Sequence, residues 1–377
     1  MLYPAVPPPE LNATRCVRYR YRYSSCERCA SACPHQAIAL HDAGVTVSAQ
    51  ACQSCALCVA VCPTQALSQP DFEPIALLRQ AIRKPSYTLA CAPSGQHGDA
   101  IVPCLGAIDA VWLAYMARRG LPVLLRGSSH CSVCRHAKPG ASQWAAALEA
   151  VQALHQALTQ ADPESAPVWA MPVHENQPVS QTEKALTAIK KKAGDARRGF
   201  LKRLLRPRQS EPSKTSPQPL QQGAIRAGAY IVSEPRELLH IVCRQDQPAE
   251  LVWHEALPLL ALTLNSGCTL CEACFRVCPT AAITITETPE DWALDFDQDR
   301  CVGCLACLDV CQPKVLDAHS HLDPRPGQPP VRLIAQVKQR CRRCDRHFIS
   351  AQPQAECPVC SDDALAFDAI FGSDEAD

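Results

Sequence analysis

The sequence predicts an α+β chain built from several small modules, and three observations support that prediction. Cysteine supplies 25 of the 377 residues, far more than an ordinary globular domain contains. Proline supplies 33 residues and favours turns and linkers. The aromatic residues, 7 Phe, 5 Trp and 7 Tyr, are too few for one large hydrophobic core.

The cysteines fall into groups along the chain. Eight lie in residues 16–62, four in 91–134, eight in 268–311 and four in 341–360, while Cys243 stands alone. The opening MLYPAVPPPE lacks the basic and apolar segments of an export signal. We therefore expect a cytoplasmic protein whose thiols stay reduced and bind metal, instead of forming a disulfide framework.

These groups divide the chain into five expected regions. They are cysteine-rich modules at 1–85 and 226–330, an α/β module at 86–162, a basic Pro/Ser-rich linker at 163–225 and a four-cysteine module with an acidic tail at 331–377. Within the linker, the stretch PRQSEPSKTSPQPLQQG is too polar to fold alone. Residues 185–205 can form a basic helix.

The strongest motif is a repeated run, CxxCxxCxxxC, in residues 268–311. Three thiolates spaced in this way can wrap one face of a cubic iron–sulfur cluster, and the fourth reaches a neighbouring cluster. The segment resembles the bacterial two-cluster ferredoxins. That resemblance implies one [4Fe–4S] cluster on Cys268, Cys271, Cys274 and Cys311, and a second on Cys278, Cys301, Cys304 and Cys307. The alternative is two structural zinc sites, which favour paired CxxC knuckles.

The N-terminal module resembles the same family with one departure. One run is complete, but the other has Tyr23 where its first thiolate belongs. The resemblance implies a third cluster on Cys33, Cys52, Cys55 and Cys58, and a fourth on Cys26, Cys29 and Cys62. We expect Cys16 to complete the fourth cluster, because it is the one nearby thiol without a place in the other sets. The alternating VRYRYRY after it predicts a strand that a short turn could fold back. A three-iron cluster or a solvent ligand are the alternatives.

Short hairpins are expected beside the clusters. IALH and VTVS flank a turn after Cys33, and ITITE and WALDF follow Cys278. Charge separates the two modules, because residues 1–85 carry eight Lys/Arg and five Asp/Glu, whereas 268–318 carry three and nine. Positive surroundings stabilise a reduced cluster, so we expect higher potentials in the N-terminal module.

The central segment alternates predicted strands and helices: SYTLACAP, AIDAVWLAYMARRG, LPVLLRG and SQWAAALEAVQALHQALTQ. Its cysteines follow strands, so they can converge at one sheet edge. With its PCLGAID segment and His/Cys-rich loop, the module resembles the delta subunit of methyl-viologen-reducing hydrogenase, although its CSVC loop is tighter. The resemblance implies a [2Fe–2S] cluster on Cys91, Cys104, Cys131 and Cys134. The alternative is that Cys91 and Cys104 are buried as small apolar residues.

The last four cysteines form two CxxC knuckles typical of a zinc ribbon, and their expected ligands are Cys341, Cys344, Cys357 and Cys360. Rubredoxin-like iron is the alternative, because a sulfur tetrahedron suits either metal. The basic residues around the site suit an interaction module at least as well as nucleic acid. We expect Cys243 to be buried on a strand.

The fold class is thus α+β, with two ferredoxin-like modules, a central α/β module and a zinc-ribbon-like module. There is no GxGxxG, GxxxxGK, nucleophile elbow or HExxH, and no small-molecule substrate is evident. We predict a polyferredoxin that passes single electrons between redox partners of the dehydrogenase or hydrogenase type, without transmembrane segments and without nucleic-acid binding.

Two other functions stay open. One is an accessory or maturation factor for a molybdenum or nickel oxidoreductase, since the layout resembles ferredoxin-type proteins that accompany bacterial formate dehydrogenases. The other is a redox sensor that controls transcription through the basic ribbon.

Overall fold

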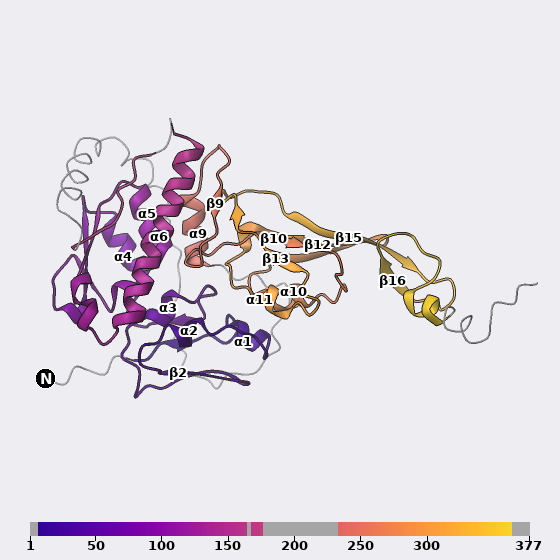
Figure 1. Ribbon diagram of the computed structural model, residues 1–377, viewed down its shortest axis with the longest axis horizontal. Helices are drawn as coiled ribbons and strands as arrows, with labels where there is room; N and C mark the ends of the chain where they lie inside the picture. Colours follow the sequence, from indigo (N-terminus) through magenta and orange to yellow (C-terminus); the bar gives the residue numbers. More distant parts are fainter. Residues whose placement is uncertain (1–6, 164–166, 176–232, 364–377) are drawn as a thin grey trace, which may run out of the picture.

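The computed structural model describes residues 7–163, 167–175 and 233–363 (Figure 1). The N-terminal cysteine-rich region lies beneath a parallel sheet with its helices, and the C-terminal region lies beside both. A long strand then extends away from these three parts (Figure 1). The basic helix expected at 185–205 lies outside the described residues.

The N-terminal region consists of short elements. They are β1 (Glu10–Leu11), α1 (Val17–Arg20), α2 (Arg28–Ser31), β2 (Ile38–His41), β3 (Gly44–Val47), α3 (Leu57–Ala60) and β4 (Leu67–Ser68). The predicted hairpin is present, because β2 and β3 pair antiparallel. The strand predicted for VRYRYRY is wrong at Val17–Arg20, which form a helical turn. This turn buries Val17 against Val277 and Ala306, a tertiary contact that local alternation does not report.

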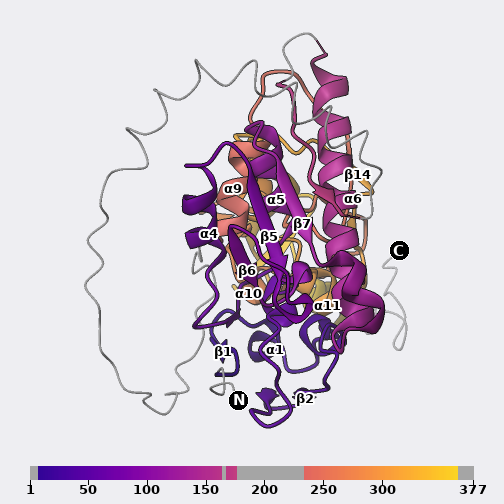
Figure 2. The same ribbon diagram turned by 90° about the vertical axis from the view of Figure 1, so that its left-hand side faces the viewer.

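The middle of the chain forms a four-stranded parallel sheet. Its order is β6-β5-β7-β8, and the strands are β5 (Tyr87–Cys91), β6 (Ala100–Val102), β7 (Val123–Arg126) and β8 (Val173–His174). The helices are α4 (Pro74–Ala81), α5 (Ala110–Arg118) and α6 (Ala137–Ala161), and Figure 2 shows α5 and α6 beside β5 and β7. The predicted strands and helices are found here, while β8 lies within the region 163–225 expected to be linker.

Helix α9 (Glu234–Val242) packs on α5 and extends the same core. Its residues Arg236, Leu239 and Val242 recur at helical spacing and are buried. Cys243 is buried as predicted, but it caps the end of α9 and does not lie on a strand. The helical spacing of the buried residues before it explains the difference.

The C-terminal region contains two small strand pairs and a larger sheet. The pairs are β10 (Leu262–Leu264) with β13 (Leu316–Ala318), and β9 (Leu251–Val252) with β14 (His321–Leu322). The sheet has the order β11-β12-β15-β16, with β11 (Ile283–Glu287), β12 (Asp291–Phe296), β15 (Val331–Arg340) and β16 (His347–Ser350). The predicted hairpin is β11–β12. The helices are α10 (Ala273–Val277) and α11 (Ala306–Val310).

Strand β15 connects the C-terminal region to the last four cysteines. It pairs with β12 over Val331–Val337 and with β16 over Val337–Arg340. Short 3₁₀ turns complete the described part: Ala92–Ser94, Leu105–Ala107, Ser128–Val133 and Gln298–Arg300. No helix in residues 7–163, 167–175 or 233–363 combines the length and apolarity needed to cross a bilayer.

Candidate metal centres

The complete cysteine runs share a repeated backbone geometry. Residues two and four places after the first cysteine of each run have positive φ: Ser54, Ala56, Leu270, Glu272, Gly303 and Leu305. A further positive φ follows three residues after the last cysteine of all four runs, at Gln36, Gln65, Ala281 and Lys314. Such left-handed residues curl the chain and turn successive N–H groups toward one side, as an anionic group requires. The incomplete run lacks the first pair, since φ of Glu27 is −129°.

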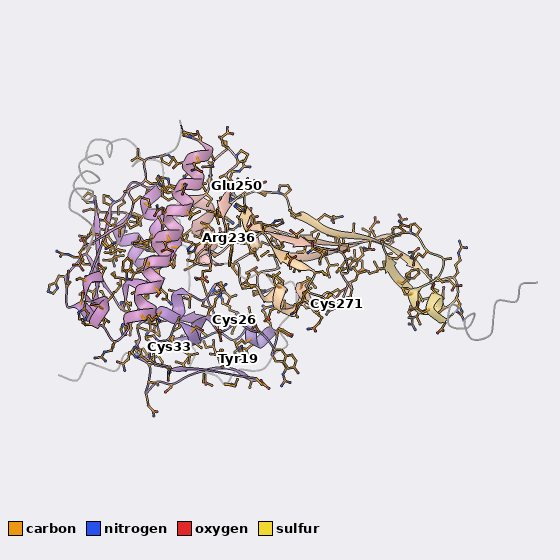
Figure 3. All side chains as sticks on the ribbon, viewed as in Figure 1. Tyr19, Cys26, Cys33, Arg236, Glu250 and Cys271 are labelled. Atoms are coloured by element: carbon orange, nitrogen blue, oxygen red, sulfur yellow. The ribbon has the colours of Figure 1, made fainter. Side chains whose placement is uncertain are left out.

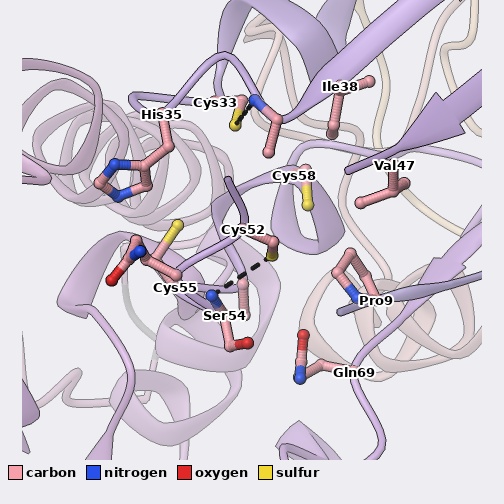
Figure 4. Close-up of a pocket in the computed structure, with 13 residues that line it drawn as sticks. Pro9, Cys33, His35, Ile38, Val47, Cys52, Ser54, Cys55, Cys58 and Gln69 are labelled. Atoms are coloured by element: carbon pink, nitrogen blue, oxygen red, sulfur yellow. Dashed lines mark hydrogen bonds between the residues drawn. The ribbon is translucent and has the colours of Figure 1, made fainter. Parts of the chain in front are cut away.

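One cavity is lined by the thiols of Cys33, Cys52, Cys55 and Cys58, which we call the N-outer set (Figure 4). Figure 4 also shows His35 and Ser54 at this cavity. Backbone N–H groups already point at the sulfur atoms: Ala37 N lies 3.3 Å from Cys33 Sγ, and Ser54 N lies 3.4 Å from Cys52 Sγ. Burial raises the pKa of the Cys55 and Cys58 thiols, and the neighbouring thiols raise both further.

A second cavity is lined by Cys16, Cys26, Cys29 and Cys62, the N-inner set. Burial, with smaller contributions from the other three thiols nearby, raises the pKa of Cys29 to about 12. Ala66 N donates to Cys62 Sγ at 3.2 Å. The structure therefore brings Cys16 to the other three thiols, through a helical turn instead of the expected strand.

The C-terminal thiols form two further groups. Cys278, Cys301, Cys304 and Cys307 are the C-inner set. Burial, with a smaller contribution from Cys278, raises the pKa of Cys301 to about 12. Cys268, Cys271, Cys274 and Cys311 are the C-outer set. Burial raises the pKa of Cys274 to about 11, with contributions from Cys268 and Cys271. Cys311 is half-buried and packs in the same apolar cluster as Cys274.

The central cysteines, Cys91, Cys104, Cys131 and Cys134, line a third cavity together with His130 and His136. We call them the central set. As expected, they lie at strand ends: Cys91 ends β5, and the others follow β6 and β7. Gly140 leaves room for this group, because an added Cβ would lie 2.9 Å from Cys104 Sγ.

The last four cysteines, Cys341, Cys344, Cys357 and Cys360, form a much tighter group, the ribbon site. Their Sγ atoms all lie within 4.8 Å of one another, and Cys344 Sγ is 3.8 Å from Cys357 Sγ. A tetrahedral ion with bonds of about 2.3 Å to sulfur separates its ligands by about 3.8 Å. Cys357 N also donates to Cys341 Sγ at 3.3 Å. The site therefore fits a single metal ion.

The other thiol groups do not have this compact geometry. Within the described residues, no other group of three or more Cys, His, Asp or Glu ligand atoms lies so close together. Each of the N-outer and N-inner sets surrounds a cavity instead. Four sulfur donors around a cavity, with N–H groups aimed at them, fit a polynuclear iron–sulfur cluster better than one ion.

The thiol sets lie next to one another in a fixed order. Cys104 of the central set and Cys55 of the N-outer set belong to one small buried cluster with Leu57. Cys29 of the N-inner set is close enough to Cys58 to raise its pKa. Cys304 of the C-inner set lines the N-inner cavity. In the same way Cys274 contributes to the raised pKa of Cys307. Figure 3 shows Cys33, Cys26 and Cys271 in succession along the long axis.

Three arginines that the sequence did not single out lie at the junction of the two inner sets. Arg18 lines the N-inner cavity, while Arg20 and Arg28 donate hydrogen bonds to carbonyl groups of the C-terminal region. Two of them belong to VRYRYRY, where alternation alone predicts a strand. The available signal was the alternating arginines that directly follow Cys16, the cysteine outside the ferredoxin spacing.

A family model described as a 4Fe–4S dicluster domain matches residues 24–66 and 267–315. Cys16 lies outside the first match. No solved structure matches the chain. The relatives found include one subunit of an ion-translocating oxidoreductase complex from Methanosarcina acetivorans, which is 28% identical over 81 residues, 22% of this chain and 26% of that protein.

Two further relatives belong to sulfur-compound reductases by name. One component of the polysulfide reductase of Wolinella succinogenes is 30% identical over 29% of this chain and 53% of its own length. The thiosulfate reductase electron transfer subunit PhsB of Salmonella typhi is 32% identical over 27% of this chain and 46% of its own length. The chain thus spans about half or less of the length of these three relatives.

These matches agree with the prediction from the cysteine runs. They confirm an iron–sulfur protein of the electron-transfer type at the level of the matched domains. The N-outer set and three members of the N-inner set lie in the first matched segment, and both C-terminal sets lie in the second. We call the regions that contain these matched segments, residues 24–66 and 267–315, the N-terminal and C-terminal dicluster domains.

Proposed function

We propose that the chain conducts single electrons between redox partner proteins through four [4Fe–4S] clusters in one row. Their order is N-outer, N-inner, C-inner and C-outer. The observation that supports this most strongly is the shared boundary of the inner sets: Cys304 of one dicluster domain lines the cavity of the other. Neighbouring one-electron centres at such a boundary permit transfer within one chain.

The residues of the chain would hold each cluster and adjust its electron affinity. A bound [4Fe–4S] cluster supplies reversible one-electron chemistry. The buried thiols must lose protons to ligate iron, and their raised pKa values mean that cluster binding releases those protons. Backbone donors such as Ala66 N and Ala282 N point at ligand sulfur, where they stabilise negative charge.

Iron and sulfide analysis of anaerobically purified chain tests the content, and about sixteen irons per chain are expected. Freeze-quench EPR after a substoichiometric electron pulse tests conduction. We expect the electron to redistribute among clusters at a rate independent of protein concentration. In Cys304→Ser, which lacks an inner ligand, redistribution should depend on concentration. A concentration-dependent rate in the wild-type chain contradicts the proposed conduction.

We further propose a fifth centre, a [2Fe–2S] cluster on the central set, as the resemblance to the hydrogenase delta subunit implies. The convergence of Cys91, Cys104, Cys131 and Cys134 on one cavity supports it, and so does the small buried cluster that Cys104 shares with Cys55. Iron should then rise to about eighteen per chain, and Cys91→Ser should remove about two irons. Unchanged iron in Cys91→Ser would favour the buried apolar role.

We propose zinc for the ribbon site. The 3.8 Å separation of Cys344 and Cys357 supports a tetrahedral ion, and iron is the competing metal. We expect one zinc per chain and its loss in Cys344→Ser with iron unchanged. Cys243→Ala serves as the matched control that retains both metals. An extra iron that Cys344→Ser removes would identify a rubredoxin-like site instead.

A second candidate function is an accessory or maturation factor for a molybdenum or nickel oxidoreductase, such as formate dehydrogenase. The ribbon site projects from the cluster domains on β15, an extension that electron carriage alone does not require (Figure 1). Such a factor would bind the apo-form of its enzyme and be dispensable in turnover. An electron carrier would instead be re-oxidised rapidly by the active enzyme.

A further inference from the structure

We propose that Arg20 and Arg28 are positioning residues that bridge the two dicluster domains and raise the electron affinity of both inner clusters. This inference rests on the proposed conduction. It gives a role to the VRYRYRY segment and to Arg28, which lies just beyond it.

Both arginines reach across the domain boundary. Arg20 Nη1 donates to the carbonyl of Cys278 at 3.4 Å, and Arg28 Nη2 donates to the carbonyl of Gly303 at 3.2 Å. These acceptors lie within the cysteine runs of the C-inner set. Ser25 N adds a third bond to Asp309 Oδ2 at 2.6 Å. The N-terminal loop is therefore fixed to the C-inner set at three points.

An apolar contact lies beside these hydrogen bonds. Val17, Val277 and Ala306 are each at most 4% exposed, and Cys26 and Cys304 pack against them. Such a contact excludes water, so charges beside it are screened less than at a free surface. The guanidinium groups therefore act on the inner sets more strongly than surface arginines would.

The charge arrangement is complementary. Arg20 interacts electrostatically with the thiols of Cys278 and Cys304, and Arg28 interacts with those of Cys26 and Cys304. Once these thiols ligate iron they are thiolates, and each one-electron reduction adds another negative charge. A fixed cation between two such groups stabilises the reduced form of both.

Arg18 gives an independent indication that an anionic group belongs in the N-inner cavity. Its Nη1 donates to the carbonyls of Ser24 and Cys26, at 2.6 and 3.1 Å. Its Nε is buried and has no hydrogen-bond partner among the described residues. A buried donor without a partner is costly, and the side chain lines the cavity where a cluster would bind.

Arg22 provides a matched control from the same segment. Its guanidinium pairs with Asp42 at 3.2 Å, and the two side chains are 59% and 82% exposed. Arg22→Gln removes the same charge at the surface, where an ion pair contributes little. Arg20→Lys with Arg28→Lys keeps the charges but alters the hydrogen bonds to the two carbonyl groups.

The test is an EPR-monitored redox titration of the full chain, with iron content measured in parallel. In Arg20→Gln/Arg28→Gln we expect the reduced-to-oxidised ratio of the inner clusters to fall about tenfold at a fixed potential, which is about 59 mV for one electron. The magnetic interaction between the two reduced inner clusters should weaken as well. The inner clusters of Arg22→Gln should have the same reduction potentials as those of the wild type. In Arg20→Lys/Arg28→Lys, which we call the Lys pair, these potentials should stay close to the wild-type values.

Unchanged inner potentials in the Gln pair, with full iron content, would overturn the proposal, and so would an equal shift in Arg22→Gln. If Arg20→Gln/Arg28→Gln loses iron from the inner clusters, its potentials cannot be compared with those of the wild type, and the iron content of the Lys pair becomes the test. Retention of iron in the Lys pair supports the charge role, and loss in both overturns it. Failure of the proposed conduction looks different, because the wild-type chain itself would then redistribute electrons at a rate that depends on protein concentration.

Discussion

The two dicluster domains build their inner thiol sets in different ways. In the C-terminal domain all eight cysteines follow one repeated spacing, and the positive-φ pair Gly303 and Leu305 curls the loop of the C-inner set. In the N-terminal domain Tyr23 replaces a cysteine, the corresponding pair is absent, and Cys16 reaches the set from before α1. In both sets one thiol comes from the end of the other run, Cys278 or Cys62. The loop of the C-inner set supplies the other three thiols itself, whereas the loop of the N-inner set supplies two and Cys16 supplies the last through a tertiary contact.

This difference explains where the domains meet. A loop that does not need to curl around its own cluster is available for contacts elsewhere. Residues between Cys16 and Cys29 make such contacts: Val17 packs on the C-terminal domain, and Arg20, Ser25 and Arg28 donate hydrogen bonds to it. The departure from the ferredoxin spacing therefore coincides with the contact between the two domains.

The largest expected effect concerns iron content. Cys268→Ala and Cys16→Ala each remove one thiol, the first from a local run and the second from the tertiary contact. If both thiols are ligands, each variant should lose between about one and four irons per chain, with a three-iron cluster as the smallest change. Anaerobic iron and sulfide analysis with EPR of the oxidised state measures this.

Cys243→Ala is the control for these two variants, because Cys243 is fully buried and lines none of the thiol cavities described above. It should keep all iron. Full iron in Cys16→Ala, together with loss in Cys268→Ala, would show that the N-inner cluster uses a solvent ligand.

The next largest effect concerns the reduction potentials of the four proposed clusters. Residues 1–85 have a surplus of basic residues and 268–318 a surplus of acidic ones, and Arg20 and Arg28 also face the C-inner set. We therefore expect the C-outer cluster to have the lowest potential of the four. The reduction potential of the C-outer cluster should lie more than about 59 mV below those of the N-terminal clusters, which is a tenfold difference in the reduced-to-oxidised ratio. The wave of lowest potential should disappear in Cys268→Ala, and its persistence would contradict the assignment.

The thiol sets were predictable from sequence because their spacing is local. Each CxxCxxC run fixes which sulfur atoms lie close together, and hairpins such as β2–β3 follow from alternation beside a turn. Strands β5 and β7 of the parallel sheet were predictable for the same reason. Cys16 was placed near its set by elimination, although the strand expected after it is a helical turn.

The order of the sets was not predictable, because it depends on contacts between distant segments. Arg20 and Cys278 are 258 residues apart, and no local pattern relates them. The same holds for β15, whose pairing with both β12 and β16 joins the ribbon site to a dicluster domain. Periodicity identifies a strand but does not identify its partner.

A smaller effect depends on pH and on Cys243, which is buried where α9 packs on α5. Cys243 lies near Arg236, which donates to the carbonyls of Gln298 and Asp299 beside Cys301. Burial raises the pKa of Cys243 from 9.0 to about 12. The folded chain therefore holds this proton more tightly than the unfolded chain does, and stability should fall as the pH rises above 9.0 toward 12.

The measurement is the free energy of unfolding in urea from neutral pH to about pH 10, for the wild type and Cys243→Ala. One titrating thiol changes the slope by at most about 1.4 kcal/mol per pH unit. Cys243→Ala should show the shallower alkaline loss. Equal slopes in the two chains would mean that Cys243 does not contribute to the alkaline loss.

The smallest expected effect concerns Gly303 in the loop of the C-inner set, and it tests why glycine occupies this position. Ser54 and Leu270 occupy the position equivalent to Gly303 and tolerate positive φ, so backbone conformation alone does not require glycine there. An added Cβ at Gly303 would lie 3.0 Å from the carbonyl oxygen of Leu259, whereas one at Gly327 would meet nothing within 4 Å. We therefore expect Gly327→Ala to cost about 1 kcal/mol for its positive φ, and Gly303→Ala to cost about 1 kcal/mol more for overpacking. Urea unfolding measures the loss of unfolding free energy in the two variants. Equal losses would contradict the expected overpacking and would show that the loop moves to accommodate the extra methyl group. Gly303 would then serve the same backbone turn as Ser54 and Leu270.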